Sequence, residues 1–254
     1  MTDAAVAQMT EHLTCNQEVA GLSPAGGTIL TAMQPAFLPW CGLIARIAAA
    51  DKFVLFDAVQ FERQSFQNRN RIKTATGVQW LTVPVKLNGH MDKPISQIEI
   101  APGNWARKHL RAIELAYAKA PYFEAYYSPL QAIYAKDWRY LAGLNRGILD
   151  WLLACLDIQI PIISASEQGF EGSKSALVLD MCLKLGATGY IFGAMGKGYA
   201  DVGAFERAGV KVWFQDYQYP AYPQLHGQFV PNLSVIDLLF NCGSDSLKII
   251  KGKT

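Results

Sequence analysis

The sequence predicts an α/β fold: a mostly parallel sheet with a β-α-β opening, a helical middle segment and a second α/β portion. Two observations lead to this prediction. Short apolar runs alternate with segments of helical periodicity at both ends of the chain, and the middle contains longer helical stretches that begin at capping residues. Nothing in the composition marks a linker, so we expect a single domain over residues 28–254.

The opening predicts two strands, at residues 28–33 and 52–56, joined by a helix at 40–50 whose apolar residues have helical spacing. Pro35 and Pro39 fix an extended turn before that helix. Because a helix connects the strands, they should be parallel. Asp57 should then lie at the carboxyl end of the second strand, where α/β sheets commonly bind ligands.

The middle of the chain should be mainly helical. Residues 58–72 are polar and are expected to form a loop, and 79–85 are strand-like. Asn104 can cap a helix that ends at residue 118, and Asp137 can cap another that ends at 156.

The last third returns to an α/β pattern. Strands are expected at residues 161–164, 190–192 and 210–214, with a helix at 175–185 that Ser173 caps and Gly186 ends. Ser234 and Asp237 have the spacing of a capping box, which predicts a short terminal helix.

The composition limits the class of protein. The 254 residues are 51% hydrophobic and 17% charged, with a formal net charge of +2, which indicates a compact soluble protein with no nucleic-acid or membrane-binding character. The five cysteines are an odd number without metal-ligand spacing, so we expect reduced thiols and a cytoplasmic location. No metal is expected, no cofactor is indicated, and no segment has the features of a membrane span or signal peptide.

Residues 1–27 stand apart from the rest of the chain. Leu13–Gln17 and Ala20–Ala25 can be encoded by nucleotides that pair as the anticodon and T arms of a transfer RNA gene. We therefore expect either translation from a misplaced start codon or a disordered natural extension, without function in both cases.

Asp57 is the first candidate catalytic residue. A lone carboxylate that ends an apolar strand can act as a general base, orient an amine or bind a hydroxyl, although it can also serve only to orient the loop. Gln34, at the tip of the preceding strand, should lie next to it and is the second candidate.

Arginines and amides cluster after Asp57. Guanidinium groups suit bidentate capture of phosphate or carboxylate, and a solvated basic loop is the alternative. The candidate substrate-binding residues in this cluster are Gln60, Arg63, Asn68, Arg69 and Arg71.

Further substrate-binding candidates lie in the last third of the chain. Lys174 begins a predicted helix, where backbone N–H groups can hold an anion. A glycine-rich run after the 190–192 strand contributes Gly193, Lys197 and Tyr199, although it matches no phosphate-loop or dinucleotide fingerprint. Gln224 lies in an aromatic and polar stretch that can line a site or cover the sheet.

Several spaced motifs resemble one known family. They read Gln-Pro-x-Phe-Leu-Pro-Trp-x-Gly from Gln34, Phe-Val-x-x-Asp-x-Val-Gln-Phe from Phe53, Gln-Asn-Arg-Asn-Arg-Ile from Gln67 and Trp-Leu-Thr-Val-Pro-Val from Trp80. Together with segments near residues 186–193 and 233–241, they resemble the WbqC-like proteins over roughly residues 29–243.

The resemblance implies a role in bacterial gene clusters for surface polysaccharides, such as O-antigen, or natural products. On that basis we expect a transferase of an activated acyl or aminoacyl group, on a small molecule or a carrier protein, to an amino sugar or other amine. No nucleophile motif occurs, which favours direct transfer with Asp57 as the base. The alternatives are a non-catalytic module that binds a carrier protein or glycan precursor and, less expected without a His-x-Gly-His motif, a nucleotidylyltransferase-like enzyme.

Overall fold

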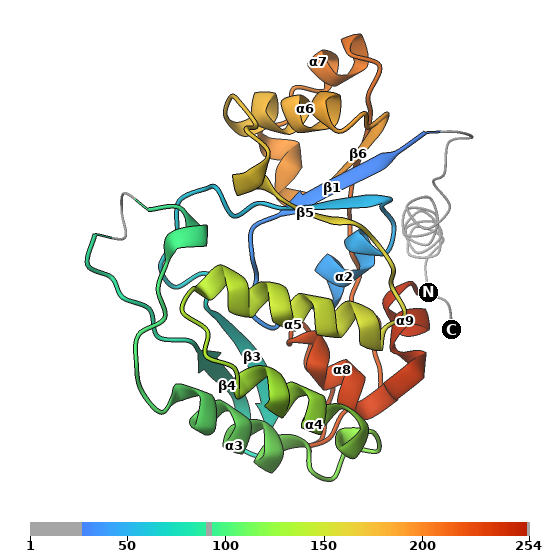
Figure 1. The fold of residues 1–254 in the computed structure, drawn as a ribbon. Helices are drawn as coiled ribbons and strands as arrows, with labels where there is room; N and C mark the ends of the chain where they lie inside the picture. Colours follow the sequence, from blue (N-terminus) through green and yellow to red (C-terminus); the bar gives the residue numbers. More distant parts are fainter. Residues whose placement is uncertain (1–26, 90–92, 253–254) are drawn as a thin grey trace, which may run out of the picture. The chain divides into compact units, whose positions relative to one another are not determined.

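The computed structural model describes residues 27–89 and 93–252 (Figure 1). These residues form two compact units, each assembled from separate segments of the chain. The first unit contains the residues up to Met33, Ala45–Leu55 and Ile160–Gln218, and the second contains Gln34–Ile44, Phe56–Gln159 and Tyr219–Thr254. Because the segments interleave, no linker is visible in the sequence. A single domain over residues 28–254 stays a prediction, and residues 1–26 of the expected extension lie outside the described part.

The first unit is built on a five-stranded parallel sheet, which confirms the predicted α/β class. Its strand order is β5-β2-β1-β6-β7, and β1 pairs with β2 so that Met33 lies opposite Leu55. The strands are β1 (Ile29–Met33), β2 (Lys52–Leu55), β5 (Ile162–Ser164), β6 (Gly189–Phe192) and β7 (Lys211–Phe214).

Helices α6 (Lys174–Lys184) and α7 (Val202–Arg207) lie on the same face of this sheet (Figure 1). Both connect parallel strands, and right-handed crossovers in one direction along a sheet place their helices on one face. Two short 3-10 helices, η3 (Ala165–Glu167) and η4 (Ala194–Gly198), follow the carboxyl ends of β5 and β6. The apolar side chains of β2 and β6, and those of Ile29 and Leu30 in β1, are almost completely buried, and they form the core of this unit.

The second unit combines a hairpin with helices. The antiparallel hairpin of β3 (Arg69–Thr74) and β4 (Gly77–Thr82) lies next to α3 (Trp105–Tyr117), and α4 and α5 follow along the chain (Figure 1). The remaining elements are η2 (Ile95–Gln97), α4 (Phe123–Tyr134), α5 (Leu141–Cys155), α8 (Val235–Cys242), η5 (Gly243–Asp245) and α9 (Ser246–Ile250). Helix α2 (Cys41–Ile47) begins in this unit and ends in the first.

Three predicted details of the second unit were wrong. The expected loop at 58–72 ends in β3, because the inward-facing residues there include the amides Asn68 and Asn70 and so hide the apolar alternation of a strand. Asp137 caps no helix, since α5 begins at Leu141. The predicted short helix is present as α8, and the Ser234 side chain caps it by accepting from the Ile236 N–H. Asp237 does not complete a capping box, because the Ser234 N–H donates to the Arg71 carbonyl and the Asp237 carboxylate accepts from two tyrosine hydroxyls.

In the described part of the chain, no helix combines the length and the apolar character that crossing a membrane requires.

Candidate functional site

The polar side chains at the start of strand β3 point alternately to the buried side and to the more exposed side of the strand. Asn68, just before the strand, and Asn70 are 8% and 1% exposed, whereas Arg69 and Arg71 project from the other side of the strand and are less buried. The sequence motif Gln-Asn-Arg-Asn-Arg therefore has two parts. Its amides are structural and its guanidinium groups are available for chemistry.

Both arginines of β3 lie over Trp80. The Arg69 and Arg71 guanidinium carbons are 4.5 and 5.5 Å from the centre of the Trp80 ring, and Arg71 pairs directly with Trp80 across the hairpin. Phe66 lies 6.0 Å from the same ring, between centroids. Since Trp80 is 44% exposed and Phe66 is 40% exposed, this cluster is a surface platform of aromatic rings and cations.

Backbone carbonyls fix the orientation of the two guanidinium groups. Arg69 donates to the carbonyl of Gln64, and Arg71 donates to that of Asn232 over 2.8 Å. The Nε atoms of both arginines are buried and have no acceptor. The two guanidinium groups are therefore held in place, and their charge remains available to attract an anion.

A pocket of about 270 Å³ adjoins this platform. Three of the predicted substrate-binding residues, Arg63, Asn68 and Arg69, are among the residues that line it. The Asn68 amide nitrogen donates to the Val83 carbonyl over 2.9 Å, while its Oδ1 is buried without a donor. The pocket therefore offers the cations Arg63 and Arg69, whereas the Asn68 amide is engaged with the backbone. The other lining residues are Phe61, Gln64, Thr82, Pro84, Val85 and Leu87.

The remaining candidates of the second unit lie outside this pocket. Asp57 is 6% exposed, and its backbone carbonyl accepts from the Ser96 N–H over 3.0 Å, whereas Gln60 forms a bridge with Pro94. Gln34 accepts from the Gln67 amide over 2.8 Å, so it connects the first motif to the third. Asp57, Gln34, Gln60 and Arg71 do not line the pocket.

Gln224 belongs to a buried polar network that the sequence did not predict. Its Oε1 accepts from Lys73 Nζ over 3.2 Å, and Lys73 is only 3% exposed. Asp237, which is fully buried, accepts hydrogen bonds from the hydroxyls of Tyr117 (2.7 Å) and Tyr222 (2.9 Å). Burial raises the pKa of Asp237, and the two tyrosine hydrogen bonds oppose that rise. The sequence feature that could have indicated this network is an aspartate, Asp237, inside the apolar run of the predicted terminal helix.

The candidates of the first unit are on α6 and after β6. Lys174 is exposed at the first position of α6. Gly193 directly follows β6, Lys197 is an exposed residue of η4, and Tyr199 is 45% exposed. Arg46, a buried residue that packs against Gly193, was not predicted from the sequence. The sequence feature that could have indicated Arg46 is its position as a single cation at the end of an otherwise apolar helix.

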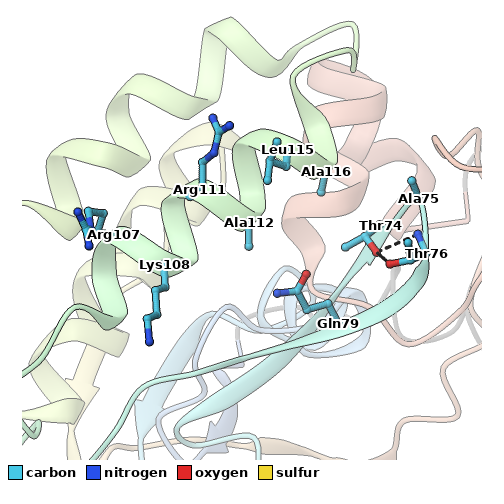
Figure 2. A pocket seen from close by; sticks show the side chains of 10 residues that line it. All are labelled: Thr74, Ala75, Thr76, Gln79, Arg107, Lys108, Arg111, Ala112, Leu115 and Ala116. Atoms are coloured by element: carbon cyan, nitrogen blue, oxygen red, sulfur yellow. Dashed lines mark hydrogen bonds between the residues drawn. The ribbon is translucent and has the colours of Figure 1, made fainter.

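A larger groove of about 750 Å³ lies between α3 and the hairpin. Figure 2 shows Lys108 and Ala112 on the side of α3 that faces the hairpin, with Gln79 pointing back toward the helix. Arg107, Arg111 and the exposed Leu115 are also among the lining residues, and no lining residue is acidic. The groove thus combines an alanine-rich wall with a basic edge. This groove was not predicted from the sequence.

The cysteines of the described residues are poor nucleophiles. Burial is the largest factor at each of them, and it raises the pKa of Cys41 and Cys182 to about 12 and that of Cys155 and Cys242 to about 11. A thiol of this kind stays protonated at neutral pH. Over residues 27–89 and 93–252, no group of three or more His, Cys, Asp or Glu side chains could hold a metal ion.

The fold and the site define an α/β protein in which a parallel sheet is accompanied by a helical unit with an arginine-bearing hairpin. The chain belongs to the WbqC-like protein family, whose model matches residues 34–249, and the resemblance seen in the sequence is thereby confirmed. It is 33% identical over 216 residues to the uncharacterized protein Rv1507c of Mycobacterium tuberculosis (strain ATCC 25618 / H37Rv). The matched region covers 84% of this chain and 94% of that protein. No solved structure matches the chain.

Proposed function

We propose that this protein is a transferase that moves an activated acyl or aminoacyl group to an amino sugar or another amine. The observation that carries the proposal is the pocket where Arg63, Asn68 and Arg69 converge. Its two guanidinium groups, on Arg63 and Arg69, suit a ligand with an anionic group. Activated acyl donors carry phosphate or another leaving group of this kind.

Asp57 is the proposed general base. Asp57 does not itself line the pocket, but the segment that follows it contributes Phe61 and Arg63 to the lining, four and six residues further along the chain. In the proposed step, the amine nitrogen attacks the carbonyl carbon of the donor and forms a C–N bond. The bond from that carbon to sulfur or oxygen breaks, the leaving group departs with the electron pair, and the amine proton passes to the Asp57 carboxylate. No covalent enzyme intermediate is needed, in keeping with the raised thiol pKa values.

The groove beside α3 supports an acyl rather than a nucleotidyl donor. Three lining residues follow one another at i, i+4 spacing on α3: Lys108, Ala112 and Ala116. Because an α-helix rises about 1.5 Å per residue, they extend along the groove for on the order of 12 Å. A basic end and a wall of small apolar residues fit an acyl chain that ends in an anion. The groove and the pocket lie along the same hairpin, because Thr74 and Gln79 line the first and Arg69 and Thr82 the second.

The test of catalysis is Asp57→Asn. Acyl and aminoacyl thioesters are offered to the protein with amino-sugar acceptors, and products are followed by mass spectrometry. The variant should lose on the order of 10²–10⁴ in rate, because an amide keeps the shape of the carboxylate but accepts no proton. Its melting temperature and its affinity for the donor should change little. Full activity in this variant would remove Asp57 from catalysis and favour a non-catalytic binding module.

Arg69→Lys tests the pocket itself. Lysine keeps the charge but loses the planar fork, so we expect donor affinity to fall by about tenfold, the equivalent of one charged hydrogen bond. The matched control is Arg207→Lys, which changes an exposed arginine of α7 that lines neither this pocket nor the groove. Equal affinities in both variants would argue against anion binding by Arg69.

The groove has its own test. Ala112→Leu narrows it, whereas Ala118→Leu adds the same atoms to an exposed position after α3. If the groove holds the acyl chain, only Ala112→Leu raises the KM for long-chain donors, and the KM for acetyl donors stays constant. A rise for both chain lengths would assign the effect to the fold of α3.

A further inference from the structure

Arg46 is a buried cation that has no paired carboxylate within the part of the chain that the structure describes. Its side chain belongs to the first unit, at the last turn of α2, and it is 5% exposed. Its Nη2 donates to the Ala32 carbonyl over a long 3.4 Å, and its Nε is buried with no acceptor. Among the described residues, no carboxylate forms an ion pair with it.

This arrangement is energetically costly for the protein alone. Removing a charge from water carries a large penalty, which a buried ion pair or a set of hydrogen bonds normally offsets. Burial lowers the pKa of Arg46, with the nearby Tyr190 and Tyr199 acting in the opposite direction, but an arginine remains protonated in proteins. The negative end of the α2 dipole and one long hydrogen bond are modest compensation. An anionic ligand would supply what is missing.

The position of Arg46 in the sheet points to a ligand site. Strand β1 has β2 on one side and β6 on the other, so the strand order reverses at β1. Open α/β sheets bind ligands outside the carboxyl ends of their strands at such a reversal point. Ala32 is the penultimate residue of β1 and Gly193 immediately follows β6, and the Arg46 guanidinium touches both positions.

Gly193 is required by this placement. A Cβ atom at residue 193 would collide with Nη1 of Arg46, so only glycine allows the guanidinium to lie against the backbone there. The following run, residues 194–200, contains the exposed Lys197 and no acidic residue. The loop therefore adds a second cation and no competing carboxylate.

We propose that Arg46 and the loop 193–198 form a binding site for a phosphate group at the carboxyl edge of β1 and β6. The guanidinium fork offers parallel N–H donors that match two oxygens of a phosphate, and the two cations of the site suit a dianion better than a single carboxylate. The inference does not rest on the transfer reaction above. Arg46 lines neither the pocket nor the groove of the second unit.

The experiment titrates inorganic phosphate and pyrophosphate into the full chain, with binding measured by calorimetry and by ³¹P line width. The wild-type protein should bind pyrophosphate, and Arg46→Met should lose at least about tenfold in affinity, since charged hydrogen bonds disappear while side-chain length is kept. Without ligand, the melting temperature of Arg46→Met should be equal to or above that of the wild type, because an unpaired buried charge has been removed. Arg207→Met, at an exposed arginine of α7, is the matched control.

The outcomes separate clearly. Absence of pyrophosphate binding to the wild type, or equal affinities in Arg46→Met and Arg207→Met, overturns the proposal. If Arg46→Met fails to fold, Arg46→Lys decides, because it keeps the charge and loses only the fork. A loss of about tenfold in that variant supports the site, and wild-type affinity overturns it.

Phosphate groups reach proteins on different molecules, and two further probes identify the source. Uridine diphosphate and glucosamine 1-phosphate are compared with pyrophosphate in the wild type and in Arg46→Met. Tighter binding of the nucleotide that depends on Arg46 assigns the site to a nucleotide, and tighter binding of the sugar phosphate assigns it to a sugar. If either compound still binds more tightly than pyrophosphate in Arg46→Met, the assignment of that compound to this site is overturned.

Discussion

The side-chain amide of Asn70 donates a hydrogen bond of 2.6 Å to the backbone carbonyl of Leu38. Leu38 has φ of +45° and precedes a proline, two features that rarely occur together in a leucine. Phe37 N–H also bonds the Phe66 carbonyl over 2.9 Å. The segment before β3 and its amides thus hold the loop after β1 in an otherwise unfavourable conformation.

Asn70→Ala should destabilise the protein. Asn70 is 1% exposed, and its loss leaves the Leu38 carbonyl without a donor, at a cost of about 1–3 kcal/mol. Urea denaturation measures the change in the free energy of unfolding. Asn104→Ala is the control, because the Asn104 side chain forms no capping hydrogen bond. Similar values for both variants would show that Asn70 does not hold the loop.

Two glycines of η4 should respond oppositely to alanine. A Cβ at Gly196 would lie 2.6 Å from the Phe192 Cβ, whereas one at Gly198 meets nothing within 4 Å. Gly196→Ala should therefore cost about 1–3 kcal/mol through overpacking, and Gly198→Ala should be neutral or slightly stabilising. Thermal denaturation of the pair gives the answer. A stable Gly196→Ala variant would mean that the loop after β6 adapts easily.

Tyr222→Phe should weaken the buried network around Asp237. Removing the hydroxyl takes away the 2.9 Å hydrogen bond to a fully buried carboxylate, which costs about 1.5–3 kcal/mol for a bond to a charged group. The pKa of Asp237 should also rise further, because that hydrogen bond lowers it. The measurement is the free energy of unfolding at neutral pH. Tyr126→Phe, which changes a half-buried tyrosine, is the control, and its free energy of unfolding should change little.

His109 should make stability depend on pH. Burial lowers its pKa from 6.5 to about 4 in the folded protein, although the hydrogen bond to the Thr82 carbonyl opposes this. The unfolded chain therefore binds a proton between these values while the folded chain does not. The contribution is fully present above pH 6.5 and is lost as the pH falls toward 4.

Between pH 7 and pH 5, this residue should remove about 2 kcal/mol of stability. His109→Gln, which keeps an N–H donor for Thr82, should flatten the dependence by that amount. Denaturation curves of both proteins at the two pH values provide the comparison, and other titrating groups cancel in the difference. Parallel pH profiles would show that His109 is not buried as a neutral ring.

Part of the candidate site followed from the sequence. Arg63, Asn68 and Arg69 could be selected because guanidinium and amide groups after an apolar strand have a recognisable chemistry, and they do line one pocket. Arg71 and Gln34 were selected on the same grounds but do not line it, since Arg71 donates to the Asn232 carbonyl and Gln34 accepts from Gln67. Local sequence identifies which groups can bind an anion. It does not specify which carbonyls and rings will already occupy them.

The sequence alone determined the α/β class, the parallel β-α-β opening and the family, because apolar periodicity and motif order are properties of the chain itself. Tertiary structure decided the interleaving of the two units, the strand β3 and the groove beside α3. It also decided the contact of Arg46 with Gly193, two residues that are about 147 positions apart in the chain. These features depend on contacts between residues distant in sequence. A buried charge or an alanine-lined groove leaves no periodic pattern in the sequence, since it is defined by what packs around it.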